Sequence, residues 1–91
     1  MRNAVTDDEL ITSLNQIGKS AFVRYFHELR QGHDALLYGE YKPAGVAIRM
    51  SYSSRIFKAG READALRIII NSGRVPLKDR NLARKLLMER E

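Results

Sequence analysis

Cysteine is missing from this sequence, since none of its 91 residues is one. Disulfides, cysteine zinc fingers and thiol-based active sites are therefore excluded, and so short a chain without cross-links suits the cytoplasm. Tryptophan is also absent, proline occurs only twice, and the longest aliphatic run is Ile68–Ile70. That run is far too short to cross a membrane. We therefore expect a cytoplasmic protein with no membrane anchor.

Motifs for catalysis, metals and cofactors are scarce as well. The Gly-Lys-Ser at 18–20 has the ending of a phosphate-binding P-loop, but Ser13 stands where that pattern needs its first glycine. The only histidines, His27 and His33, are six residues apart, which is not a recognised metal-ligand spacing. No Gly-x-Ser-x-Gly sequence marks a nucleophile. We predict no enzymatic activity, metal or cofactor, and a simple turn between two helices at 18–20.

The charge of the chain is unevenly distributed along its length. Residues 1–48 carry five basic and six acidic side chains, a net charge of −1, whereas residues 49–91 carry eleven and five, a net charge of +6. A basic half of this kind attracts polyanions such as nucleic acid. Hydrophobic residues make up 44% of the chain, as in ordinary globular proteins, so we expect one small domain over 1–91.

The segment 61–72 is the most apolar and is expected to form the centre of the core. Wound as a helix, it is apolar over most of its surface, and such helices are normally buried. Asp64, Arg67 and Asn71 fill one polar strip, where we expect Arg67 to be buried and to pair with Asp64. Gly73 is expected to end this helix in a left-handed conformation.

Other helices are predicted around this centre. Thr6 and Glu9 have the spacing of a capping box, which indicates a first helix over 7–17. A second helix is expected over 19–31, with an aromatic face that packs on the helix over 61–72.

The segment 33–59 allows two interpretations. A short helical turn is expected over 35–38 and a helix over 52–59, while 44–50 fits either a helix that starts at Pro43 or a strand. The predicted fold is therefore an all-α, compact single-domain bundle of four or five short helices, with a short hairpin around 36–50 as the alternative for that segment.

The last helix, over 77–89, carries the strongest functional signal because its two faces separate into an apolar stripe and a basic side. With 61–72 it would form a helix–turn–helix, although Ile69 and Asp79 stand where that motif has a small and an apolar residue. We predict a nucleic-acid-binding or regulatory module that contacts the phosphates of DNA or RNA. The predicted contact residues are Arg74, Lys78, Arg80, Asn81, Arg84 and Lys85, extended by Arg55, Lys58 and Arg61.

The alternative function belongs to another class. In this interpretation the apolar helix over 61–72 and the aromatic face of 19–31 complete their burial against a protein partner or a second copy of the chain. The protein would then be a protein-interaction or dimerisation domain, such as an adaptor domain of a larger assembly.

Overall fold

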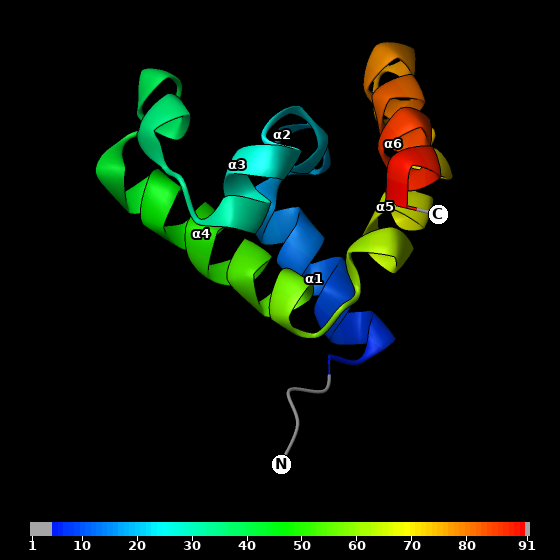
Figure 1. Cartoon of the computed structure of the whole chain (residues 1–91), viewed down its shortest axis with the longest axis horizontal. Helices are drawn as coiled ribbons and strands as arrows, with labels where there is room; N and C mark the ends of the chain where they lie inside the picture. Colours follow the sequence, from blue (N-terminus) through cyan, green and yellow to red (C-terminus); the bar gives the residue numbers. More distant parts are fainter. Residues whose placement is uncertain (1–4, 91) are drawn as a thin grey trace.

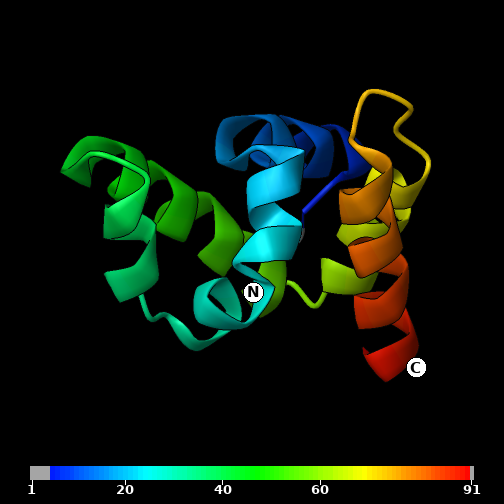
Figure 2. The ribbon, with the colours of Figure 1, turned by 90° about the horizontal axis from the view of Figure 1, so that it is seen from above.

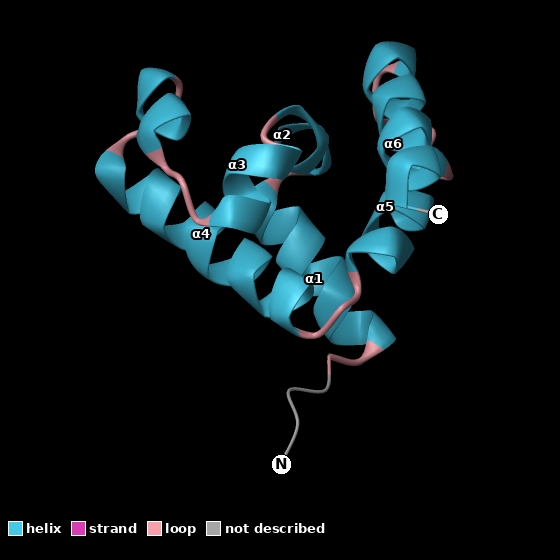
Figure 3. Ribbon diagram, viewed as in Figure 1, coloured by secondary structure: helices cyan, strands magenta, loops and turns pink. Residues whose placement is uncertain are grey.

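Two pairs of helices form the framework of the fold: α1 (Asp7–Ile17) lies against α4 (Pro43–Lys58), and α5 (Glu62–Ile70) lies against α6 (Leu77–Arg90) (Figure 1). Two shorter helices lie between these pairs: α2 (Lys19–Arg24) contacts α6, and α3 (Phe26–Gln31) contacts α4. The computed structural model describes residues 5–90, which form helices and turns but no strand (Figure 3). In chain order the elements are α1 (Asp7–Ile17), α2 (Lys19–Arg24), α3 (Phe26–Gln31), the 3₁₀ helix η1 (Ala35–Gly39), α4 (Pro43–Lys58), α5 (Glu62–Ile70) and α6 (Leu77–Arg90). The all-α prediction is confirmed.

The core lies where the two helix pairs meet α2 and α3. Phe22 and Phe26 are buried and pack on Phe57 of α4, with ring centroids 5.6 and 5.3 Å from it. Leu66 and Ile69 of α5 are fully buried, as expected for the most apolar segment. The radius of gyration, 12.3 Å, matches the ~12 Å of a compact chain of this length, so the helices form one globule.

Local signals fix the start and end of α1. The Thr6 hydroxyl accepts a hydrogen bond from the Glu9 amide at 3.2 Å, and the Glu9 carboxylate accepts one from the Thr6 amide at 2.9 Å. This capping box starts the helix where the sequence predicts it. Gly18, with φ of +91°, joins α1 to α2. The predicted turn between two helices is therefore present but consists of Gly18 alone, because Lys19 and Ser20 belong to α2.

The hairpin around 36–50 is wrong, because a single helix runs from Pro43 to Lys58. Proline is well placed at the start, where its missing N–H would have no partner in the helix. Val46 and Ile56 are buried on one side of α4, whereas Ile48 is 43% exposed. In a strand, alternate residues such as Val46 and Ile48 would be buried on the same face, and they are not. The period of a helix instead explains why Val46 and Ile56 are both buried.

The second predicted helix differs from the structure in two respects. It divides at Tyr25, with φ of −110° and ψ of 24°, into α2 and α3, although 19–31 contains no glycine or proline to mark a break. Its aromatic face packs on α4, a partner that was not predicted, because α3 lies against α4 and Phe22 and Phe26 contact Phe57 of that helix.

None of the described helices has the length and the apolar character needed to cross a lipid bilayer.

Candidate nucleic-acid interface

Helix α6 buries one side and presents a basic side to solvent. Ala83 and Leu86 are buried, while Leu82 and Leu87 pack against the core at its edge. The opposite side of the helix is exposed along its length. We define four exposed residues of this side, Lys78, Asn81, Arg84 and Lys85, as the basic face of α6. Glu89, near the end of the helix, is also exposed.

The cations on and near this face lack acidic partners. None of the five lysines and arginines between residues 74 and 85 forms an ion pair with any residue of the described chain. Arg84 donates a hydrogen bond to the Asn81 side-chain oxygen at 2.7 Å, a contact within the face. The charge of the basic face is therefore available to an external anion.

Arg74 and Arg80 have different surroundings from the basic face of α6. Arg80 is partly buried, and its Nε donates to the Val75 carbonyl at 3.0 Å, so it holds the turn that leads into α6. Arg74 is exposed in that turn and lines a pocket with residues of α2. Arg80 therefore positions the start of α6, and Arg74 lies beside the face.

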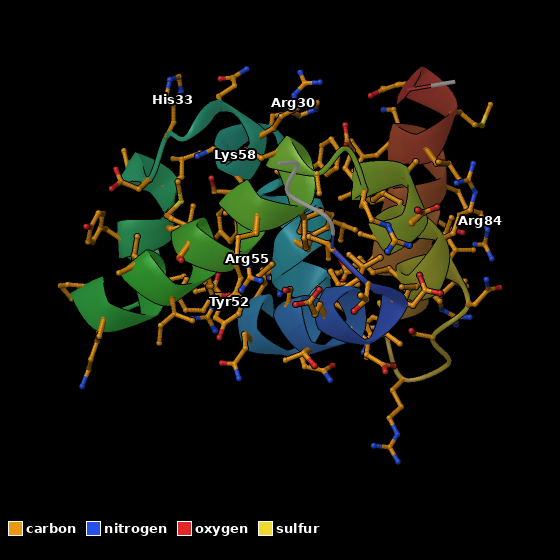
Figure 4. All side chains as sticks on the ribbon, turned by 90° about the horizontal axis from the view of Figure 1, so that it is seen from below. Arg30, His33, Tyr52, Arg55, Lys58 and Arg84 are labelled. Carbon is orange, nitrogen blue, oxygen red and sulfur yellow. The ribbon has the colours of Figure 1, made fainter. Side chains whose placement is uncertain are left out.

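The predicted extension through Arg55, Lys58 and Arg61 does not join this face. Figure 4 shows Arg55 and Lys58 on α4, well separated from Arg84 on α6. Arg55 lies 3.8 Å from the Glu9 carboxylate. The geometry thus brings together the predicted residues of α6 but leaves those of α4 elsewhere on the molecule.

Arg61 is committed to the fold. Its guanidinium donates to the Val5 carbonyl at 2.5 Å and lies 2.7 Å from the Asp7 carboxylate and 3.0 Å from the Asp64 carboxylate. The hydrogen bonds that Arg61 donates to Asp7 and, to a lesser extent, to Asp64 raise its pKa above the ordinary value. This arginine ties the start of α1 to α5 and is not free to bind phosphate.

The α5–α6 unit is a helical hairpin and not a helix–turn–helix. The two helices lie side by side in both views (Figures 1 and 2). Their connection, from Asn71 to Pro76, has six residues, whereas a helix–turn–helix joins two steeply crossed helices through three or four. A contact of α6 with nucleic acid therefore does not follow from that motif and depends on the exposed charge alone.

Both histidines lie on the surface, where His27 and His33 are exposed. Within residues 5–90, no group of three or more histidine, aspartate or glutamate side chains has an arrangement that could hold a metal ion.

One cluster of cations was missed by the sequence interpretation. Lys19, Arg24 and Arg49 lie around the same pocket as Arg74. They come from α2, α4 and the turn before α6, so no spacing along the chain relates them. Only the folded arrangement of three separate segments brings these charges together.

Comparison with protein-family models, with curated proteins and with solved structures found no match to this chain.

Proposed function

We propose that this chain binds nucleic acid through the basic face of α6. The observation that supports the proposal is a difference in ion pairing between the basic residues of α6 and those elsewhere in the chain. Arg55 and Arg61 are engaged by acidic side chains of α1 and α5, whereas Lys78, Arg84 and Lys85 of α6 form no ion pair with the described residues. Unpaired cations on the exposed side of a helix match the spaced negative charge of a phosphate backbone.

Most of the binding free energy in this proposal is electrostatic. Lysine and arginine side chains release counterions when they neutralise phosphates, so affinity falls steeply as salt rises. Asn81 and Arg84 are also the types of side chain that can hydrogen-bond to adenine and guanine edges. Their mutual hydrogen bond, at 2.7 Å on the surface, would have to open for either to read a base. We therefore expect binding with little sequence preference.

The proposal is tested by charge reversal on the basic face. The variant Lys78→Glu/Arg84→Glu/Lys85→Glu changes only exposed residues, so it should fold. Fluorescence anisotropy with labelled duplex DNA, single-stranded DNA and RNA measures the dissociation constant at two salt concentrations. We expect affinity to fall at least about tenfold for the preferred nucleic acid, because three phosphate contacts become repulsive.

A charge-matched control separates a local site from general attraction. The variant Arg30→Glu/Lys42→Glu/Lys58→Glu reverses the same number of exposed cations on α3, α4 and the segment before it. Figure 4 shows Arg30 and Lys58 far from Arg84. We expect the control to keep most of the affinity. An equal loss in both variants would contradict a binding face on α6.

Protein association is a second candidate function, and the structure changes the residues on which it depends. The aromatic side chains Phe22 and Phe26 and the centre of α5 are buried within the domain, so they do not need a partner to cover them. Large apolar side chains are exposed instead on η1 and α4: Leu36 at 60%, Tyr38 at 51% and Ile48 at 43%. Sedimentation velocity over a range of concentrations tests self-association through them. A monomer throughout would contradict a homodimer.

A further inference from the structure

A pocket of about 380 Å³ opens beside α2, where Gly18, the first half of α4 and the turn before α6 meet. Figure 2 shows α2 between α4 on one side and the α5–α6 hairpin on the other. Four cations line the pocket, and no aspartate or glutamate is among its described lining residues. The cations are Lys19, Arg24, Arg49 and Arg74.

Arg49 is held in a defined orientation within this pocket. Its guanidinium lies over the Tyr41 ring, 3.7 Å from the centroid, and its Nη1 donates to the Gly45 carbonyl at 3.1 Å. A Cβ at Gly45 would lie 3.1 Å from the same Nη1, so the glycine leaves the space that the guanidinium occupies. The ring and the carbonyl fix the cation before any ligand arrives, which lowers the entropy cost of binding.

Part of the Arg49 guanidinium is also withdrawn from water. Its Nε is buried and makes no hydrogen bond with the described residues. Attraction between this charge and an anion is less screened than it would be at an open surface. Arg49 therefore presents a positive charge to the pocket that is held in place and weakly screened.

The charge of the pocket is largely unbalanced. The Glu40 carboxylate lies 3.9 Å from Arg24, interacts electrostatically with Arg49 as well, and accepts a hydrogen bond from the Tyr25 hydroxyl at 2.5 Å. Lys19 contacts a neutral group, the Asn15 side-chain oxygen, at 3.2 Å. Arg74 has no ion-pair partner among the described residues. At most one of the four positive charges is balanced.

We propose that this pocket binds a small phosphorylated molecule through these four cations. A phosphate monoester or a diphosphate carries two or more negative charges on one compact group, which matches several cations converging from different elements. The volume falls within the ~300–1,000 Å³ range of small-molecule sites. This binding does not depend on nucleic-acid binding by α6, because Lys19, Arg24 and Arg49 lie on α2 and α4 and do not belong to the basic face of α6.

Isothermal titration calorimetry of the full chain at constant ionic strength tests the proposal. The probes are inorganic phosphate, pyrophosphate and adenosine diphosphate, with sodium chloride as the reference anion. We expect saturable binding of at least one phosphate probe, and the tightest probe identifies the ligand as free phosphate, a diphosphate or a nucleotide. Heats that do not saturate for any of the three would overturn the proposal.

Variants locate the binding in the pocket. In Lys19→Gln/Arg49→Gln we expect the dissociation constant to rise at least about tenfold, because two charge-assisted contacts are lost. If loss of the Tyr41 contact unfolds that variant, Lys19→Gln/Arg24→Gln alters less buried side chains and carries the same expectation.

The control variant is Arg30→Gln/Lys58→Gln, which removes two cations from a pocket of similar size, about 430 Å³, between α3 and α4. It should bind the phosphate probe as the parent protein does. An equal loss in the control would overturn the assignment to the α2 pocket. Oligonucleotide binding is measured separately on the same variants, so either proposal can fail while the other stands.

Discussion

At the scale of single residues, the contact between Tyr25 and Glu40 makes stability depend on pH. The Tyr25 hydroxyl donates to the Glu40 carboxylate at 2.5 Å. This hydrogen bond is the main reason that the pKa of Glu40 is lowered and that of Tyr25 is raised. A lowered carboxylate pKa stabilises the fold above the ordinary value of 4.5, and this contribution is lost as pH falls through the lowered pKa. The raised pKa of Tyr25 stabilises the fold at pH values below the ordinary tyrosine value of 10.0, and this contribution is lost as pH rises through the raised pKa.

The variant Tyr25→Phe tests this linkage. We expect its melting temperature to lie a few degrees below that of the parent near neutral pH, because the bond to the ionised Glu40 is lost. The difference should shrink as pH falls below the ordinary glutamate value of 4.5. Tyr38→Phe is the matched control, since it makes the same chemical change at a side chain that is 51% exposed. A difference between parent and Tyr25→Phe that is the same at pH 3 and pH 7 would contradict the account.

Local pairs of residues can be predicted from the sequence, and distant partners cannot. Arg67 does pair with Asp64, three residues away, at 3.3 Å, but it is exposed and not buried as expected. Asp64 is shared with Arg61, whose other acidic partner, Asp7, is 54 positions away in the chain. Helical spacing reveals the first contact, whereas the second exists only because α1 and α5 meet in the fold.

At the scale of helices, the C-terminal end of α5 is formed by other interactions than the sequence predicts. The predicted left-handed glycine at the end of α5 is wrong, because only Gly18, Gly32 and Gly60 have a positive φ among the described residues. The Ser72 hydroxyl donates to the Ile68 carbonyl at 2.7 Å, and the Asn71 amide donates to the Arg67 carbonyl at 3.0 Å. These side chains satisfy the last carbonyls of α5, so the turn does not need a left-handed residue.

Replacing the glycine at the end of α4 should be costly, and replacing Gly73 should not. Gly60 has φ of +70° and nothing within 4 Å of an added Cβ, so the cost of Gly60→Ala is backbone strain of about 1–2 kcal/mol. That corresponds to a fall in melting temperature of roughly 4–16 °C for a domain of this size. Thermal denaturation followed by circular dichroism measures it.

The comparison with Gly73→Ala makes the test specific. An added Cβ at Gly73 also meets nothing within 4 Å, but the backbone there is not left-handed. We expect an unchanged or slightly raised melting temperature, since alanine reduces the freedom of the unfolded chain. Similar losses in both variants would refute the assignment of the strained position to Gly60.

The start of a helix can often be predicted from neighbouring residues in the sequence, whereas the helix that packs against it cannot. Capping by Thr6 and Glu9 and the start at Pro43 can be read from the sequence. The partner of the aromatic face of 19–31 cannot, since periodicity identifies which side of a helix is buried but not what covers it. Phe57 of α4 covers Phe22 and Phe26, and no pattern in the sequence selects it over α5.

At the scale of the whole molecule, the fold redistributes the charge that the sequence divides between its halves. Arg55 and Arg61 belong to the basic half by position, yet they lie beside Glu9 and Asp7 of the acidic half. The pairing of α1 with α4 and α5 thus brings opposite charges together. Lys78, Arg84 and Lys85 of α6 are left without such partners among the described residues. Sequence composition reveals the excess of positive charge, but only the fold shows on which helix it stays exposed.

The salt dependence of nucleic-acid affinity tests the proposed role of α6 most directly. If Lys78, Arg84 and Lys85 each neutralise a phosphate, the logarithm of the affinity falls linearly with the logarithm of the salt concentration. The slope should be about −2.7 or steeper for duplex DNA and about −2.1 or steeper for single strands. The neutral variant Lys78→Gln/Arg84→Gln/Lys85→Gln should remove that share of the slope. A slope that stays at the parent value in this variant would contradict phosphate binding by the basic face of α6.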